Sequence, residues 1–397
     1  MGFFDNIVMA PDDSIFRLSS DFASDDRGHK VNLGIGAYKT EALKPFVLES
    51  VLEAEKKAAG VKHNKEYLPI TGLPVFLSHS LQLVFGETLI AGVSARTASV
   101  QTVGGTGGLR LAGEFLATFV KPMLYMSDPT WANHQPTFTR AGMTVKSHPY
   151  YNPKLRGFDF DAMCGAIRQM PKGSAILLHA CCHNPTGCDP TFEQWKELSA
   201  LIKEQGVFPL FDFAYQGFGA GVEEDALAIR YFAEQGHEMI VVTSNSKNFG
   251  LYGERVGALF AVAADASRAQ TILSQLKVLV RNNYSNPPTH GARIVATILE
   301  TESLKKKWLS ELSGMRERIT GMRSLLAEGL IAEKGEESFG FLRKQSGMFS
   351  FSGLEKQQAE SLKTEHGIYM TNDGRISICG LNQENIDCVI KAILSVL

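Results

Sequence analysis

The sequence predicts an α/β protein built on a mostly parallel β-sheet with helices on both faces, together with a smaller α/β domain. Between residues 97 and 262, short apolar segments alternate with helical patterns, and this alternation is typical of parallel sheets. The chain has 397 residues, which is too long for one simple core. We therefore expect two domains.

The composition indicates a soluble globular protein and gives no support for nucleic acid or a membrane as a partner. Apolar residues make up 44% of the chain and charged residues 21%. The formal net charge of -2 provides no electrostatic case for binding nucleic acid or an anionic membrane. No apolar run approaches the ~18 residues of a membrane span, and the first residues lack the basic region of a signal peptide. We expect a cytoplasmic protein without nucleic-acid or membrane partners.

Each strand of the expected sheet is a short apolar run. Strands are predicted at 99–103, 123–126, 144–148, 175–179, 208–213, 239–243 and 257–262, with helices between them that include 109–119, 192–204 and 225–235.

A long amphipathic helix is predicted after the sheet. Apolar residues recur there at steps of three and four, which is the helical period; they are Leu304, Trp308, Leu312, Met315, Ile319, Met322 and Leu326. We interpret it as a helix that joins and covers two domains, because the pattern stops too soon for a free coiled coil. The tail returns to strand and helix signals at 347–351, 357–365, 375–378 and 383–397.

The segment with most chemical content surrounds Lys247, directly after the strand at 239–243. Ser244 and Ser246 flank this lysine, and Arg255 follows eight residues later. A lone lysine at a strand end is usually a solvated charge. Here the hydroxyl and guanidinium groups are phosphate donors beside an amine that can form a Schiff base. This combination suits pyridoxal phosphate, which needs a covalent anchor and a phosphate site.

Other polar residues follow the ends of neighbouring strands. Asp212 ends the strand at 208–213, Asn184 follows 175–179, and a glycine-rich turn with unhindered N–H groups follows 99–103. Because ligands of parallel sheets bind beyond the carboxyl ends of the strands, one shared site is plausible. The turn does not match the dinucleotide fingerprint, since Arg110 occupies the last glycine position. For Asp212 the alternative is a helix N-cap.

Taken in order, these segments resemble the aspartate/aromatic aminotransferases, pyridoxal-phosphate enzymes of fold type I (class I aminotransferases). The resemblance covers almost the whole chain, from the motif at 31–38 to the one at 374–381. It implies a large domain at 46–310 and a small domain made of 1–45 and 311–397. It also implies that the N-terminal segment is an arm between subunits.

The resemblance assigns the cofactor-binding residues. Lys247 is expected to anchor pyridoxal phosphate and move the proton, with Asp212 facing the pyridine nitrogen and His134 behind that carboxylate. Trp131 is expected to stack on the ring, and Tyr215 and Asn184 to bind its phenolic oxygen. The expected phosphate ligands are Gly104, Gly105, Thr106, Ser244, Ser246, Arg255 and, from the partner subunit, Tyr67. Lys247, Asp212 and Tyr67 are the expected catalytic residues.

Substrate binding and assembly are implied in the same way. Arg375 is expected to bind the α-carboxylate, and Arg281 to reach from the partner subunit to the side-chain carboxylate. Gly36, Phe349, Trp131 and Asn184 complete the expected substrate pocket. The protein is then a homodimer with sites shared across the interface. The resemblance also implies cis peptide bonds before Pro129 and Pro185.

The expected activity is amino transfer between L-aspartate and 2-oxoglutarate by a ping-pong mechanism, with amino acids and 2-oxo acids as small-molecule partners. An aromatic or dual preference is an alternative, because aromatic members of the family keep the arginine at 281. Two other hypotheses are a pyridoxal-phosphate protein that regulates without turnover and a decarboxylase or lyase. The paired arginines weigh against a decarboxylase, because clamping the α-carboxylate in the ring plane favours cleavage of the Cα–H bond.

The six cysteines show no disulfide spacing, so we expect reduced thiols. Cys181, Cys182 and His183 with Cys188 form a weak zinc motif. Zinc ligands are usually spaced two to four residues apart, and adjacent cysteines on a strand point to opposite faces. We therefore expect no metal.

Overall fold

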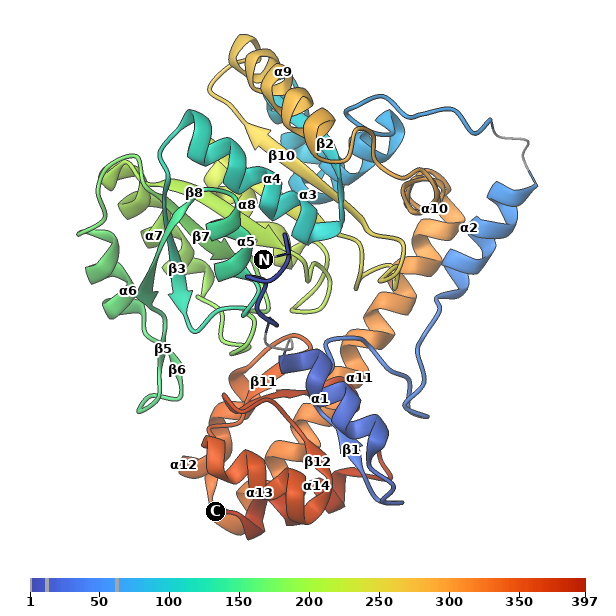
Figure 1. Ribbon diagram of the computed structural model, residues 1–397, viewed down its shortest axis with the longest axis vertical. Helices are drawn as coiled ribbons and strands as arrows, with labels where there is room; N and C mark the ends of the chain where they lie inside the picture. The colour runs from blue at the N-terminus through green and yellow to red at the C-terminus, as the bar shows by residue number, and fades with distance from the viewer. Residues whose placement is uncertain (1, 11–13, 61–63) are drawn as a thin grey trace.

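The computed structural model describes residues 2–10, 14–60 and 64–397 (Figure 1). Its centre is a seven-stranded sheet in the order β2-β10-β9-β8-β7-β3-β4. The strands are β2 (Thr97–Val103), β3 (Met123–Asp128), β4 (Thr144–Pro149), β7 (Ala175–His179), β8 (Phe208–Phe213), β9 (Met239–Ser244) and β10 (Val256–Val262). All neighbours pair parallel except β10, which is antiparallel to β2 and β9. The predicted mostly parallel sheet is confirmed, and each predicted strand end lies within two residues of the observed end.

Helices cover both faces of this sheet, which explains why its strands are continuously apolar. In β9, Ile240 and Val242 belong to one core and Met239 and Val241 to the other. Helices α4 (Gly104–Phe119), α5 (His134–Arg140) and α9 (Ala266–Asn283) contribute to the first core. The second core includes residues of α2 (Glu49–Ala59), α3 (Pro74–Ser94), α6 (Phe160–Ile167), α7 (Phe192–Gln205), α8 (Leu227–Glu234) and α10 (His290–Glu300).

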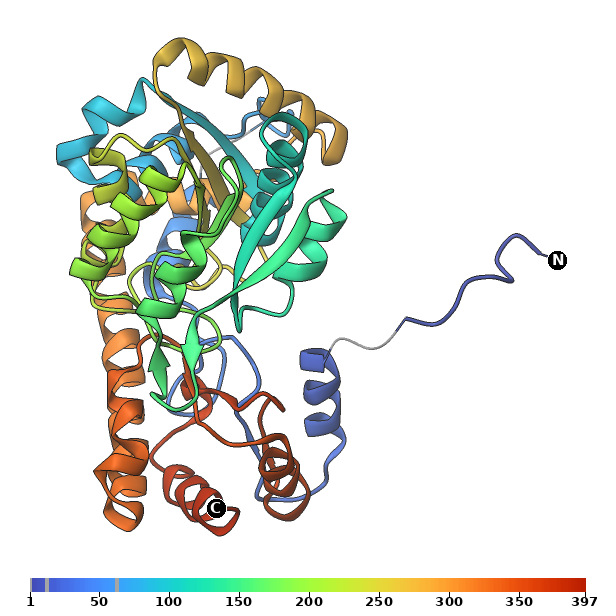
Figure 2. The same ribbon diagram turned by 90° about the vertical axis from the view of Figure 1, so that its left-hand side faces the viewer.

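The predicted long helix is confirmed as α11 (Glu302–Lys334), which has 33 residues. It runs from the helices beside the sheet down to the C-terminal elements (Figure 1; Figure 2). There, β11 (Phe349–Phe351) pairs antiparallel with β13 (Arg375–Ser377). The surrounding helices are α12 (Glu336–Phe339), α13 (Lys356–His366) and α14 (Ile386–Ser395).

The N-terminal segment joins the C-terminal elements rather than the large sheet. Strand β1 (Val31–Asn32) pairs parallel with β12 (Ile368–Tyr369), and α1 (Ser14–Ser24) precedes it. Residues 2–10 extend away from the rest of the chain, as Figure 2 shows. The domain boundaries at 45/46 and 310/311 stay a prediction.

Helix α3 is long and apolar enough, by length and composition alone, to cross a membrane. Its residues Phe76, Leu81 and Phe85 are nevertheless buried in the protein core, and the helix is interrupted at Gly86, where φ is 72°. We interpret α3 as a core helix, because core helices meet the same criteria of length and composition.

Candidate active site

A cavity of about 250 Å³ opens at the carboxyl ends of β7, β8 and β9. Most residues predicted for the site line it together, although they come from distant parts of the chain. The predicted residues that line this cavity are Gly36, Gly105, Thr106, Trp131, Asn184, Asp212, Tyr215, Ser244, Ser246, Lys247, Arg255, Phe349 and Arg375. The cavity therefore combines an amine, a carboxylate, hydroxyl groups and two guanidinium groups.

Lys247 places its amine in this cavity, 4.6 Å from the centroid of the Tyr215 ring. Burial lowers the pKa of Lys247, the charge of Asp212 raises it, and the charge of Arg255 lowers it again, with a net decrease. A neutral amine is a nucleophile and a base, whereas an ammonium group is neither. The surroundings thus favour the reactive form of Lys247.

Asp212 accepts a hydrogen bond from His134, with 3.1 Å between Oδ2 and Nε2. Burial alone would raise the pKa of Asp212. The bond from His134 and the nearby charges of His134, His179 and Lys247 outweigh burial, so its pKa is lowered. Asp212 therefore remains a carboxylate inside the cavity and can hold a positively charged group near it.

A chain of hydrogen bonds fixes the proton on His134. The backbone N–H of Asn184 donates to Nδ1 of His179 at 3.1 Å, so a neutral His179 carries its proton on Nε2, 3.4 Å from Oγ1 of Thr130. That hydroxyl then donates to Nδ1 of His134 at 2.8 Å, which leaves Nε2–H of His134 to donate to Asp212. Burial lowers the pKa of His179 to about 3, so this ring stays neutral.

One end of the cavity is built to take an anion. Oγ of Ser244 and Oγ of Ser246 lie 3.1 Å apart, and Nη1 of Arg255 lies 3.4 Å from Oγ of Ser246. A Cβ atom on Gly104 would lie 2.6 Å from Nη2 of Arg255, and one on Gly105 would lie 3.1 Å from Cβ of Ser244. The positive φ of 66° at Gly104 favours glycine at the start of α4, beside the guanidinium. Hydroxyls, a guanidinium and helix N–H groups without a carboxylate fit a phosphate group.

Arg375 also lines the cavity and has donors to spare. It is 5% exposed, and its Nε has no hydrogen-bond partner in the described part of the chain. Its Nη2 donates to the carbonyl of Gly34 at 2.7 Å, and its guanidinium lies 4.4 Å from the centroid of the Phe349 ring. Oδ1 of Asn184 is likewise buried without a partner. A buried cation with an unsatisfied donor is suited to bind a carboxylate.

Four predicted site residues do not line the cavity. His134 lies behind Asp212, and Gly104 lies against Arg255. Tyr67 is 87% exposed, and Arg281 is exposed, with its Nη1 donating to Oγ of Ser285. In a single chain, Tyr67 and Arg281 are thus outside the cavity, and their roles stay predictions.

Sequence reasoning missed four lining residues, namely Leu109, His179, Ala214 and Tyr252. The hydroxyl of Tyr252 accepts a hydrogen bond from the backbone N–H of Tyr38 at 2.8 Å. Tyr252 lies in the motif around Lys247, and His179 is the last residue of β7. Both positions in the sequence could therefore have identified these residues as part of the site. Both predicted cis peptide bonds, before Pro129 and Pro185, are present.

The expected orientation of the adjacent cysteines is wrong. Strand β7 ends at His179, and Cys182 has a φ of 52°, so the side chains of Cys181 and Cys182 do not alternate as they would on a strand. Their sulfur atoms and a carboxylate oxygen of Asp225 all lie within 4.8 Å of one another. The carboxylate of Asp225 already accepts backbone N–H groups from Gly217, Gly219, Ala220 and Gly221. Its oxygens are therefore engaged in ordering the loop.

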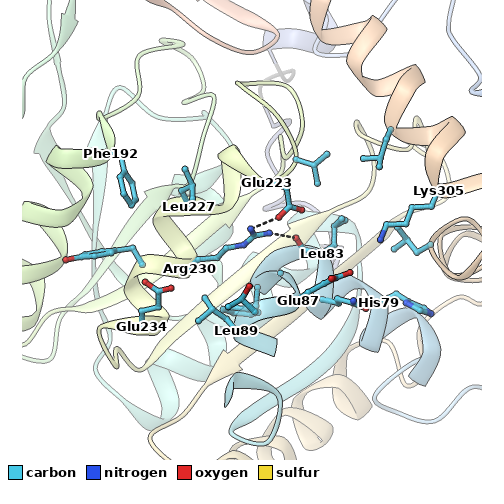
Figure 3. Close-up of a pocket in the computed structure, with 18 of the residues that line it drawn as sticks. His79, Leu83, Glu87, Leu89, Phe192, Glu223, Leu227, Arg230, Glu234 and Lys305 are labelled. Carbon is cyan, nitrogen blue, oxygen red and sulfur yellow. Dashed lines mark hydrogen bonds and ion pairs between the residues drawn. The ribbon is translucent and has the colours of Figure 1, made fainter. Parts of the chain in front are cut away.

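A larger cavity of about 850 Å³ lies elsewhere, between α3, α8 and the start of α11 (Figure 3). Its arginine, Arg230, is not free for a ligand. Nε of Arg230 donates to the carbonyl of Val84 at 3.0 Å, Nη2 donates to that of Leu83 at 3.4 Å, and Nη1 pairs with Glu223 at 2.7 Å. These carbonyls precede the interruption at Gly86, so Arg230 caps the first half of α3. The smaller cavity at the sheet edge is the better candidate for chemistry.

Comparison with known proteins agrees with this geometry. Residues 28–393 match the family described as aminotransferase class I and II. The chain is 47% identical to the aspartate aminotransferase of Escherichia coli (strain K12), over 99% of this chain and 100% of that protein. It is 45% identical to the mitochondrial aspartate aminotransferase of Dictyostelium discoideum, over 98% of this chain and 92% of that protein.

Solved structures give the same result. The crystal structure of an aromatic-amino-acid aminotransferase from Burkholderia pseudomallei, covalently bound to pyridoxal phosphate, superposes with a TM-score of 0.97 at 43% identity and covers 100% of both chains. A mitochondrial aspartate aminotransferase from Trypanosoma brucei superposes with a TM-score of 0.92 at 40% identity, over 96% of this chain and 99% of that one. The chain therefore belongs to the class I and II aminotransferase family.

Proposed function

We propose that this protein is a pyridoxal-phosphate-dependent aspartate aminotransferase. It transfers the amino group between L-aspartate and 2-oxoglutarate and yields oxaloacetate and L-glutamate. The observation that carries the proposal is the meeting of Lys247, Asp212 and Arg375 in one cavity. The names of the curated relatives at 45–48% identity support aspartate as substrate.

The residues of the cavity fit the cofactor group by group. Lys247 would hold it covalently, and Asp212 would face its pyridine nitrogen. Trp131 would cover the ring, and Tyr215 and Asn184 would contact its phenolic oxygen. The phosphate would lie among Gly105, Thr106, Ser244, Ser246 and Arg255. When bound, pyridoxal phosphate supplies the electron sink that makes the Cα–H bond of an amino acid acidic.

The protein's own side chains then orient the substrate and move the proton. Arg375 binds the α-carboxylate with its unused donors, which orients the Cα–H bond relative to Lys247. Once the substrate amine has displaced it from the cofactor, the amine of Lys247, whose pKa is lowered by burial, would take the proton from Cα and pass it to the cofactor, and it would move a proton in the reverse direction when the oxo acid is converted. Asp212 stays ionised throughout, because His134 donates to it.

The proposed protein is a homodimer with shared sites. Arg281 and Tyr67 are exposed in the single chain, as side chains that enter a neighbour's cavity would be. The N-terminal arm supports this arrangement, since Phe3, Phe4 and Val8 are exposed on a segment that contacts little of its own chain (Figure 2). We also propose the division into a large domain at 46–310 and a small one at 1–45 and 311–397. A reducing, cytoplasmic location fits the six free cysteines.

Turnover with matched substrates tests the function. The protein loaded with pyridoxal phosphate should lose its yellow colour with L-aspartate and regain it with 2-oxoglutarate, and kcat/KM should be higher for aspartate than for phenylalanine. A higher kcat/KM for phenylalanine would indicate an aromatic aminotransferase. This is the second candidate, because the aromatic-amino-acid aminotransferase of Burkholderia pseudomallei has the same fold as this chain. Colour without bleaching by any amino acid would indicate a regulatory protein and overturn the proposal.

The identity of the anchor has its own test. Borohydride reduction and peptide mapping should place the pyridoxyl label on Lys247, and Lys247→Ala should carry no label. A label on another lysine would overturn the assignment, since Lys247 is the one lysine among the described residues that line the cavity.

A further inference from the structure

A second buried arginine lies behind the carboxylate-binding wall. Arg323, on α11, is 4% exposed and does not line the cavity. Its Nε donates to Oγ of Ser350 at 3.1 Å, and its Nη2 donates to the carbonyl of Phe349 at 3.3 Å and to that of Gly347. All three acceptors belong to one short segment, which leads into and forms β11.

Arg323 forms no ion pair in the described part of the chain, and the charge of the more distant Asp189 offsets only part of the effect of burial on its pKa. Burial lowers its pKa to about 10, so it is still a cation at neutral pH. The ion pairs formed within the described ranges of the chain do not include it. Burying a cation without a carboxylate partner is unfavourable, and an apolar side chain would pack there without that cost. The guanidinium gains instead from the three oxygen atoms to which it donates hydrogen bonds.

Phe349 connects these bonds to the proposed substrate site. Its ring lies 4.4 Å from the guanidinium of Arg375 and makes an edge contact with Tyr215 at 6.1 Å between centroids. A Cβ atom on Gly36 would lie 3.0 Å from Cζ of Phe349. Phe349 thus touches the carboxylate-binding arginine and two other walls of the cavity, and a shift of its backbone would move all three contacts.

The same helix is also fixed beside Lys247. Nε1 of Trp308 donates to the carbonyl of Asn248 at 2.7 Å, and the Trp308 ring stacks on Phe249 at 4.5 Å. Further along α11, Nη1 of Arg316 donates to the carbonyl of Gly217 at 3.1 Å. Trp308, Arg316 and Arg323 are separated by eight and seven residues, so they lie on one face of the helix. Helix α11 therefore links the backbone next to Lys247 to the backbone of Phe349.

We propose that Arg323 is a positioning residue for the substrate α-carboxylate. Its guanidinium holds the carbonyls of Gly347 and Phe349 against α11, and this keeps the Phe349 ring under Arg375 and the Arg375 guanidinium at a fixed place relative to Lys247. The inference rests on the proposed aminotransferase function, because it assigns Arg375 to the α-carboxylate.

Three variants test this role. Arg323→Met keeps the length and removes the donors, Arg323→Lys keeps a charge and a donor, and Arg343→Met is the matched control. Arg343 lies in the same C-terminal region, but its side chain is 43% exposed and pairs with Glu336. Arg323→Met should raise KM about tenfold for aspartate and phenylalanine alike, since both carry an α-carboxylate, with kcat changed less than about threefold. Arg323→Lys should recover part of this loss, and Arg343→Met should equal wild type.

Two measurements do not depend on turnover. The dissociation constant of α-methylaspartate, which has no Cα–H bond to break, should rise with KM in Arg323→Met. Hydrogen exchange at residues 347–351 should become faster in that variant than in Arg343→Met. If Arg323→Met only lowers Tm and leaves KM and the dissociation constant unchanged, Arg323 is merely structural and the proposal fails.

The test separates failure of this inference from failure of the proposed function. If wild type does not turn over any amino acid, the proposed function is wrong, and the exchange rates at 347–351 still decide whether Arg323 orders β11. If Arg323→Met does not fold, KM and hydrogen exchange are compared between wild type and the variants Arg323→Lys and Arg323→Gln. Normal KM and normal exchange in both of these variants would overturn the proposal.

Discussion

Nε2 of His134 lies 3.1 Å from Oδ2 of Asp212, which lines the same cavity as Lys247. This bond depends on another residue of the cavity, because the backbone N–H of Asn184 sets the tautomer of His179 and, through Thr130, that of His134. One loop therefore both lines the cavity and keeps the proton of His134 directed at Asp212.

Asp212→Asn should lower kcat on aspartate by roughly 100-fold or more, because an amide carries no charge to hold a protonated ring nitrogen. Covalent loading at Lys247 should persist, since Asn has the shape of Asp and the amine is untouched. Steady-state kinetics with the absorbance of bound cofactor measures both effects. A kcat near that of wild type would show that Asp212 has no such role.

The amine of Lys247 should react at lower pH than an ordinary lysine in protein freed of cofactor. Burial lowers its pKa, so its neutral form persists to lower pH, whereas the charge of Asp212 raises its pKa. Asp212→Asn should therefore move the midpoint of Lys247 labelling to still lower pH. Labelling rates from mass spectrometry at a series of pH values, with exposed Lys154 as internal reference, give both midpoints. An unchanged or higher midpoint in Asp212→Asn would contradict the electrostatic account.

Arg281→Asp should weaken dicarboxylate substrates and improve cationic amino acids, because a cationic clamp is replaced by an unpaired carboxylate. Loss of a buried charged partner typically costs about 2–5 kcal/mol. The change should appear in kcat/KM for aspartate and leave phenylalanine much less affected. Arg268→Asp is a suitable control, since Arg268 is on the same helix with a side chain that is 66% exposed. Equal losses for aspartate and phenylalanine would remove Arg281 from the substrate site.

Hybrid dimers test whether sites are shared. Lys247→Ala homodimers should be inactive, and Arg281→Ala homodimers poor on aspartate. If Arg281 crosses the interface, a hybrid has one site with both residues intact and one with neither. Random reassembly makes about half of the dimers hybrid, so roughly a quarter of all sites should regain wild-type behaviour. The measurement is aspartate turnover of purified hybrids, and activity no higher than the mean of the parents would rule out sharing.

The protein should lose stability as the pH falls below about 6.5, partly because of a buried histidine. Burial lowers the pKa of His148 to about 4, and its Nε2 has no partner in the described chain. Between pH 6.5 and 4 the unfolded chain binds a proton at this residue that the folded chain does not, so the free energy of unfolding rises with pH by at most about 1.4 kcal/mol per unit.

His148→Asn should reduce this slope. The Asn amide can replace the bond from Nδ1 of His148 to the carbonyl of Pro149 but cannot titrate. Urea unfolding at pH 7 and pH 5 gives the comparison. An identical fall in stability for wild type and variant would exclude His148 as a contributor.

The sequence by itself determined the sheet and the residues at its edge. Each strand is apolar on both faces, so its location is visible without knowledge of its neighbours, as in Met239–Ser244. Lys247, Asp212 and Asn184 could be placed together because parallel strands present their carboxyl ends at one edge. Helix α11 was visible from its helical period, since one stripe of it is buried along its length.

Contacts between distant segments were decided only by the tertiary structure. The Arg375 guanidinium meets the carbonyl of Gly34 although 341 residues separate them, and the three acceptors of Arg323 lie 24 to 27 residues away. Cys181 and Cys182 turn toward each other because the chain leaves β7 with a positive φ at Cys182. Local periodicity shows which side of a helix or strand is buried. The residues that pack against that side depend on how distant segments of the chain come together, which no local pattern encodes.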